Sequence, residues 1–143
     1  MALFTVQAAF GGSSPDAKLE DLRFLSKSQS AVARYWAATG CLVLGKAAAP
    51  LKKRLQKLLE DPVPDVRVVA AEALGYIGET EKNLGVLVEV IKTGNEHEAL
   101  AAITALEALG RNGILPMKKV KGLLPQKVPG DCKRVVEAIE KIK

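Results

Sequence analysis

Apolar and polar positions along this chain form a pattern that recurs about every 33 residues. Between Val66 and Ile77, small and aliphatic residues follow the i, i+4, i+7, i+8, i+11 spacing of a helix that is buried on one face. Similar stretches follow at residues 102–110 and 135–142. A period of this length predicts a solenoid, in which each unit buries its apolar face against its neighbours. The first two copies match at Ala33 and Val66, Ala37 and Ala70, Gly40 and Ala73, Cys41 and Leu74, and Leu44 and Ile77.

Prolines, glycines and capping residues indicate where the helices begin and end. A proline disfavours helix in the residue before it, so the two prolines within residues 61–64 predict a break. Glycines that follow an apolar stripe are typical helix terminators. The expected starts are Ser14 (before Pro15), Ser30, Pro50, Asp65, Thr80 with Glu81, Asn95, Pro116 and Asp131, and the expected stops are Lys27, Gly45, Leu59, Gly78, Gly94, Gly110 and Leu124.

The second helix of each unit repeats as well. Leu51, Leu55 and Leu58 correspond to Leu84, Val88 and Ile91, and Met117 and Leu124 continue the row, with Lys121 as an interruption. We therefore expect an all-α fold, a right-handed α-solenoid of about four antiparallel helix pairs, in a single domain over residues 1–143. The expected repeats are 15–29 (partial), 30–61, 62–94, 95–125 and 126–143 (partial), after an irregular or flexible segment at 1–14.

The residue pattern of the repeat resembles that of a known family. Pro64-Asp65, Val66-Arg67, Ala70-Ala71, Ala73-Leu74 and Ile77-Gly78 are similar to a HEAT repeat of the short, phycobilisome-lyase type, and the likeness covers residues 15–143. The stretch at residues 33–38 resembles the C-terminal HEAT-repeat region that is appended to some bacterial sulfatases. This resemblance implies an accessory domain. The third copy departs from the pattern, with Ala99 in place of the arginine and Glu98 at an apolar position.

The chain carries no recognisable catalytic or cofactor motif. Neither Cys41 nor Cys132 lies in the Cys/Ser-x-Pro-x-Arg motif of the sulfatases, and the Asp and His metal ligands of that family are missing. His97 is the only histidine, which excludes a multi-histidine metal site. The glycines at 75–78 and 110–113 lack the lysine of a phosphate-binding loop. We expect no enzyme activity, no metal and no cofactor.

Length and charge limit the number of domains and the kinds of partner that the chain can have. At 143 residues the chain suits one domain, and no apolar run approaches the length of a bilayer span. The apolar segment 1–10 is a poor signal peptide because no basic residue precedes it, and the compartment stays open. The net charge is +5, and the whole excess lies in residues 111–143, which hold 9 basic and 3 acidic side chains against 12 and 13 in residues 1–110. This basic end is either a solubilising terminus or a docking patch for an acidic partner or nucleic acid.

Two aligned arginines, Arg34 and Arg67, invite a binding role. We favour a structural one, in which each arginine bonds an aspartate or backbone carbonyls of a neighbouring repeat, with Asp61 or Asp65 as the partner. Tyr35-Trp36 could stack on a nucleic-acid base, but packing at the rim of the first repeats is favoured.

The candidate partner surface lies on the second helices. Lys52-Lys53 and Lys118-Lys119 occupy the same repeat positions, two repeats apart. Between them, Val86 and Val90 stand where the preceding repeat carries Lys53 and Lys57. Either a neighbouring element covers the two valines, or they form an apolar strip flanked by lysines, which would suit a protein with an apolar centre and an acidic rim.

The sequence favours a non-catalytic scaffold or protein–protein interaction module, whose partner is another protein, a covalently linked catalytic domain or a second copy of the chain. The alternative is a nucleic-acid-binding protein that resembles the alkylpurine DNA glycosylases built from HEAT-like repeats. The residues 52–57, with four cations, and Trp36 support that alternative, while the modest charge opposes it. No membrane partner is expected.

Overall fold

A computed structural model describes residues 15–143 of the chain, and their side chains from residue 18 onward. The Ser14 cap and the expected irregular segment at 1–14 lie outside these residues. The elements are α2 (Pro15–Ser26), α3 (Ala31–Leu44), the 3-10 helix η1 (Gly45–Leu51), α4 (Lys52–Leu58), α5 (Pro64–Ile77), α6 (Lys82–Thr93), α7 (Glu96–Arg111), α8 (Met117–Leu123) and α9 (Cys132–Glu140).

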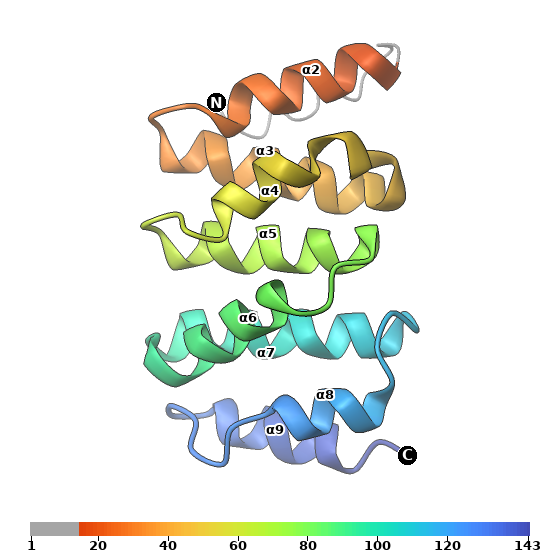
Figure 1. Cartoon of the computed structure of the whole chain (residues 1–143). Helices are drawn as coiled ribbons and strands as arrows, with labels where there is room; N and C mark the ends of the chain where they lie inside the picture. The colour runs from red at the N-terminus through yellow and green to blue at the C-terminus, as the bar shows by residue number, and fades with distance from the viewer. Residues whose placement is uncertain (1–14) are drawn as a thin grey trace.

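The helices stack into an all-α solenoid, as the periodic pattern predicts (Figure 1). The first helices of the repeats, α3, α5, α7 and α9, lie side by side in one layer, and α3 contacts α5, α5 contacts α7, and α7 contacts α9. The second helices, α4, α6 and α8, cover one side of that layer. Helix α2 packs on α3 at the N-terminal end. No strand occurs among residues 15–143.

The core lies between the two layers and follows the predicted stripe. In α5, Val66, Ala70, Ala73 and Leu74 are each no more than 1 % exposed. Alanine keeps good helix propensity while it lets neighbouring backbones approach closely. At the C-terminal end of the predicted stripe, Ile77 is only half-buried.

One glycine marks the closest approach of two first helices. A Cβ atom on Gly75 of α5 would lie 2.6 Å from Cδ2 of Leu109 in α7, and the Leu109 side chain is fully buried. Only a residue without a Cβ fits there unless Leu109 shifts.

Most of the predicted helix ends are confirmed. Gly45 and Gly78 follow their helices with positive φ angles of 59° and 110°, and Ser30 accepts a hydrogen bond from the backbone of Ala33. Asn95 forms a capping box with Glu98, in which each side chain bonds the backbone N–H of the other residue. The departure at Glu98 is therefore a capping device for α7.

Three predicted ends were wrong. Asp65 does not cap α5, because the helix already begins at Pro64, whose missing N–H makes it a suitable first residue. Gly110 lies inside α7, which continues to Arg111, and the positive φ angle falls at Gly113 instead. Pro50 lies within η1, so α4 begins only at Lys52.

The register of α6 also differs from the prediction. The alignment with Leu55 places Val88 in the core row, but Leu87 is 0 % exposed and Val88 is half-buried. Spacings of i, i+3 and i, i+4 both return to one helix face, so the period alone does not separate these two positions.

Candidate functional site

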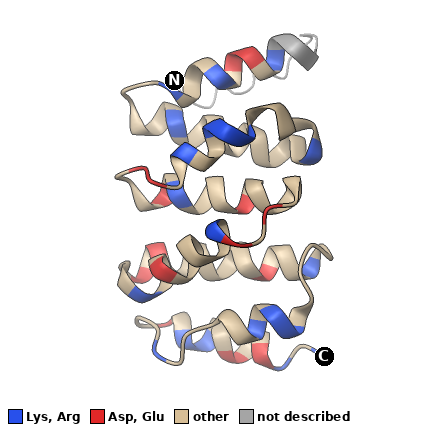
Figure 2. Cartoon of the chain, viewed as in Figure 1, with Lys and Arg blue, Asp and Glu red and all other residues tan. Residues whose placement is uncertain are grey.

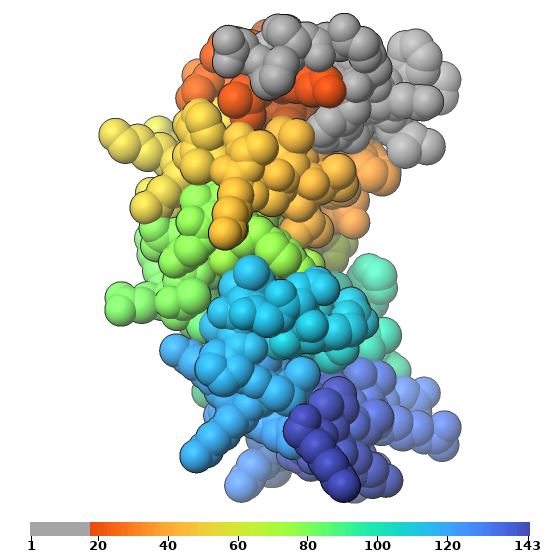
Figure 3. Space-filling view, turned by 90° about the vertical axis from the view of Figure 1, so that its right-hand side faces the viewer, coloured from red at the N-terminus to blue at the C-terminus, as the bar shows by residue number. Residues whose placement is uncertain are grey.

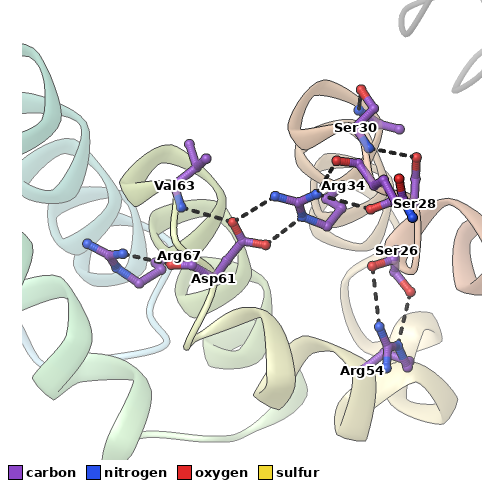
Figure 4. A network of polar contacts seen from close by, with 10 residues as sticks. Ser26, Ser28, Ser30, Arg34, Arg54, Asp61, Val63 and Arg67 are labelled. Carbon is purple, nitrogen blue, oxygen red and sulfur yellow. Dashed lines mark hydrogen bonds and ion pairs between the residues drawn. The ribbon is translucent and has the colours of Figure 1, made fainter.

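A polar network joins the loops at one end of the first repeats (Figure 4). The carboxylate of Asp61 accepts two bonds from Arg34, at 2.6 Å from Nε and 3.2 Å from Nη2. Nη1 of Arg34 also donates to the backbone oxygens of Ser28 and Gln29 at 3.0 Å. The side chain of Asp61 is only 4 % exposed, so this paired, bidentate contact satisfies a buried charge and ties the start of α3 to the segment between α4 and α5. The bonds from Arg34 to Ser28 and Gln29 join this repeat to the preceding one.

Arg67 repeats part of this arrangement one unit later. Its Nη1 donates to the backbone oxygen of Asp61 at 2.7 Å, six residues back along the chain, as Arg34 does to Ser28. The structural role expected of Arg34 and Arg67 is confirmed, with Asp61 rather than Asp65 as the acidic partner. A second link of this kind, from Arg54 to the hydroxyl and backbone oxygens of Ser26, carried no signal in the repeat alignment.

Tyr35 and Trp36 form an edge-to-face pair, with ring centroids 5.4 Å apart and planes at 78°. Both side chains are half-buried. The geometry is that of packed aromatic neighbours rather than of two parallel faces that could sandwich a base.

The candidate lysines project from the second helices. Lys52, Lys53 and Lys57 are exposed on α4, and Lys118 and Lys119 are exposed on α8. Figure 2 shows these cationic stretches on the side of the molecule that α4, α6 and α8 form. In Figure 3, long side chains in the colours of α4 and α8 protrude at the left-hand edge. Lys52 forms an ion pair with Glu79.

The valines between the lysines are not both open. Val90 is 2 % exposed and belongs to the core, and Val86 is half-buried. Together with Glu89 of α6, both line a hollow of about 300 Å³ whose other walls are Leu59 and Glu60, which directly follow α4, and Arg67 of α5. Of the two arrangements that the sequence leaves open, Val90 adopts the covered one, and only Val86 presents an apolar side chain toward solvent.

Charge is divided between the two layers of the solenoid. Each second helix has more basic than acidic residues. Helices α4 and α8 contain no acidic residue, and Glu89 is the single acidic residue of α6, beside two lysines. Within α3 to α9, all helical carboxylates except Glu89 lie on first helices: Asp65 and Glu72 in α5, Glu96, Glu98 and Glu107 in α7, and Glu137 and Glu140 in α9. The layer of second helices is therefore the positively charged side of the described chain, which the excess of positive charge at residues 111–143 alone does not predict.

The two cysteines of the chain are free thiols, and both are buried. Burial raises the pKa of the Cys41 thiol to about 12, which keeps it protonated and unreactive. Burial and the nearby Glu96 raise the pKa of Cys132 as well. His97 is exposed, and its Nε2 lies 3.9 Å from the Asp65 carboxylate. Across residues 15–143, no cluster of three or more His, Cys, Asp or Glu side chains could hold a metal ion.

One titratable group with an unusual environment was missed by the sequence analysis. Glu72 occupies a helical position that the repeat alignment treats as polar surface, yet burial raises the pKa of its carboxyl to about 7. The alignment could not show this because the surrounding apolar atoms come from three different helices.

Comparisons with known proteins agree with the architecture. No helix in the described part of the chain is both long and apolar enough to cross a membrane. A search of curated proteins finds no match. A family model described as HEAT repeats matches residues 22–107, which is more than half of the chain and runs from α2 into α7. The chain therefore belongs to the HEAT-repeat family.

Proposed function

We propose that this chain is a non-catalytic interaction module, which binds an acidic protein partner through its second helices. HEAT repeats generally serve as scaffold or interaction modules. The observation that carries the proposal is the placement of exposed lysines at equivalent positions of α4 and α8, with α6 between them.

The chemistry of this surface suits a partner with an apolar centre and an acidic rim. Val86 supplies a small apolar contact beside a hollow, and Lys53 and Lys118 stand on either side of α6. Interfaces commonly combine such an apolar centre with a polar rim. Because the lysines are exposed, they should contribute mainly to the rate of association and to specificity, and salt should weaken the complex.

We further propose that the module works beside a catalytic domain, as its resemblance to the helical region of some bacterial sulfatases suggests. A coding sequence that continues upstream into a domain with the Cys/Ser-x-Pro-x-Arg motif would support this association. A full-length native product without such a domain, together with no binding to a separately encoded one, would contradict it.

A nucleic acid is the second candidate, since α4 and α8 together present a cationic surface. If the lysines serve protein recognition, binding to duplex DNA should be weak and lost by about 0.2 M salt. Submicromolar binding to a structured or damaged nucleic acid at that salt would favour the nucleic-acid function instead.

The main test uses a peptide with two central leucines that are flanked on both sides by glutamates. Fluorescence anisotropy would compare its affinity for the native chain and for Lys53→Glu/Lys118→Glu. We expect the variant to bind at least about tenfold more weakly, a difference of about 1.4 kcal/mol.

The matched control is Lys133→Glu/Lys141→Glu, which changes the net charge equally at exposed lysines in and after α9. This control should retain most of the affinity. Equal losses in the two double variants would mean that only net charge matters, and the proposed surface would be rejected.

A further inference from the structure

A second, separate surface lies on the opposite layer, over α5. A hollow of about 400 Å³ there has walls from α3 and α7 and a floor from α5. Its lining includes Tyr35 and Leu42 of α3, Val69 and Glu72 of α5, and His97 and Leu100 of α7. In Figure 3 the outline of the molecule is indented at the right-hand edge, between the colours of α3 and α7.

The hollow is a groove that runs along α5. On α3 its lining extends from Tyr35 to Leu42, and on α7 from His97 to Ala105. At a rise of about 1.5 Å per residue, these stretches correspond to roughly 10 Å, or two helical turns. That length accommodates a few side chains of a docked segment.

The groove is mostly apolar and lies beside an uncharged helix face. The only charged residue of α3 is Arg34, which is engaged by Asp61. On the α3 wall of the groove Leu42 is half-buried, and on the α7 wall Leu100 is 38 % exposed. Aliphatic side chains that reach solvent from both walls of one groove are typical of a contact surface rather than of scattered surface residues.

Glu72 gives the groove its specificity. Within residues 15–143 its carboxylate has neither a hydrogen-bond nor an ion-pair partner, although it lies among apolar atoms. The charged or titratable groups near it are Tyr35 from α3, and His97 and Arg111 from α7; the Arg111 guanidinium itself pairs with Glu107. A cation brought into the groove would supply the missing partner and would itself be shielded from water.

We propose that the groove over α5 docks an apolar segment of a partner protein that carries one lysine or arginine, with this cation on the Glu72 carboxylate and aliphatic side chains against Leu42, Val69 and Leu100. The occupant differs in charge from the acidic partner proposed for the second helices, so one module could hold two partners on opposite sides. The chain's own residues 1–14 contain no lysine or arginine and therefore lack the side chain that the site selects.

The test is a selection from a displayed library of random helical peptides against the full chain at about pH 8, where Glu72 is ionised. A counter-selection against Thr104→Trp, which fills the groove from an exposed position of α7, removes peptides that bind elsewhere. Circular dichroism confirms that this variant remains folded. We expect the enriched peptides to carry a lysine or arginine between aliphatic residues.

Affinity measurements on one enriched peptide then isolate Glu72. Glu72→Gln should weaken binding by about tenfold, whereas Glu137→Gln, an equal change of charge on α9, should not. Affinity for the native chain should fall as the pH drops below about 7, because the carboxyl must lose its proton to pair with the cation. The pH dependence that remains in Glu72→Gln measures the contribution of every group other than Glu72.

Three results would overturn the proposal: no peptide is enriched over the filled variant, the enriched peptides lack a cation, or Glu72→Gln binds them as tightly as the native chain. Enrichment without a cation would assign the groove to a purely apolar occupant, such as residues 1–14. Because the peptide and the variants differ from those of the second-helix test, either proposal can fail without the other.

Discussion

At the scale of single residues, Glu72 shows how a tertiary neighbourhood changes a side chain that looks ordinary in the sequence. Burial raises the pKa of its carboxyl from 4.5 to about 7, and the charge of Arg111 only partly opposes this. Between these pH values the folded chain binds more protons than the unfolded chain, so the contribution of Glu72 to stability falls as the pH rises.

This linkage gives the first prediction. Glu72→Gln should raise the free energy of unfolding at about pH 8 by on the order of 1 kcal/mol, discounted because solvent partly reaches the carboxyl. The gain should shrink as the pH falls toward about 5, where the native carboxyl is protonated. Urea denaturation at several pH values measures this gain in the free energy of unfolding, with Glu137→Gln as the control. A gain that is equal at both pH values would show that ionisation is not its cause.

Two helical glycines provide a matched pair for the second prediction. Alanine at Gly75 places a Cβ 2.6 Å from the buried Leu109 side chain, whereas alanine at Gly85 of α6 meets no atom within 4 Å. Gly85→Ala should stabilise the chain by roughly 0.5–1 kcal/mol through helix propensity. Gly75→Ala should destabilise it by about 1–2 kcal/mol, because overpacking outweighs that gain. Both values follow from chemical denaturation, and a stabilising Gly75→Ala would contradict the close contact of α5 and α7.

At the scale of elements, the sequence predicted the helices where a local chemical signal marks their ends. Pro62 and Pro64 separate α4 from α5, and Gly78 adopts the left-handed conformation that its position after the apolar stripe predicts. The prediction failed where two signals are locally equivalent: Leu87 competes with Val88 for the same helix face, and Gly113 rather than Gly110 has the positive φ angle after α7.

The candidate sites also differ in whether a local sequence signal could predict them. The arginine–aspartate network was predictable, because Arg34 and Arg67 repeat at the spacing of the fold and Asp61 lies in the break between them. The burial of Val90 and the groove at Glu72 were not predictable, because both depend on which neighbouring helix supplies the covering atoms.

The third prediction concerns the start of α7. The Asn95 side chain accepts a hydrogen bond from the Glu98 backbone N–H at 2.9 Å, and the Glu98 carboxylate accepts one from the Asn95 backbone N–H at the same distance. Asn95→Ala should therefore cost about 1 kcal/mol of stability. The comparison is Asp131→Ala before α9, where the side chain makes no capping bond and the loss should be only a few tenths of a kcal/mol. Thermal and chemical denaturation compare the stability losses of the two variants. Equal losses would mean that the hydrogen bonds of the capping box add no stability.

At the scale of the whole molecule, the layered arrangement separates two kinds of chemistry. Every second helix adds cations to one side, while the first helices hold the apolar groove and, within α3 to α9, every helical carboxylate except Glu89. A stack of repeats suits this division, because each unit contributes the same two faces in the same orientation. The polar network around Asp61 and the close contact at Gly75 keep successive units in register.

The central claim, that the second helices form the partner surface, is tested most directly by mapping where the leucine–glutamate peptide binds. Amide chemical shifts of the isotopically labelled chain would be followed as the peptide is added at low and at raised salt. The account predicts that the largest changes fall on α4, α6 and α8, around Lys53, Val86 and Lys118, and diminish as salt weakens the complex. Changes concentrated on α3, α5 and α7, or on α9 and the residues after it, would contradict the account.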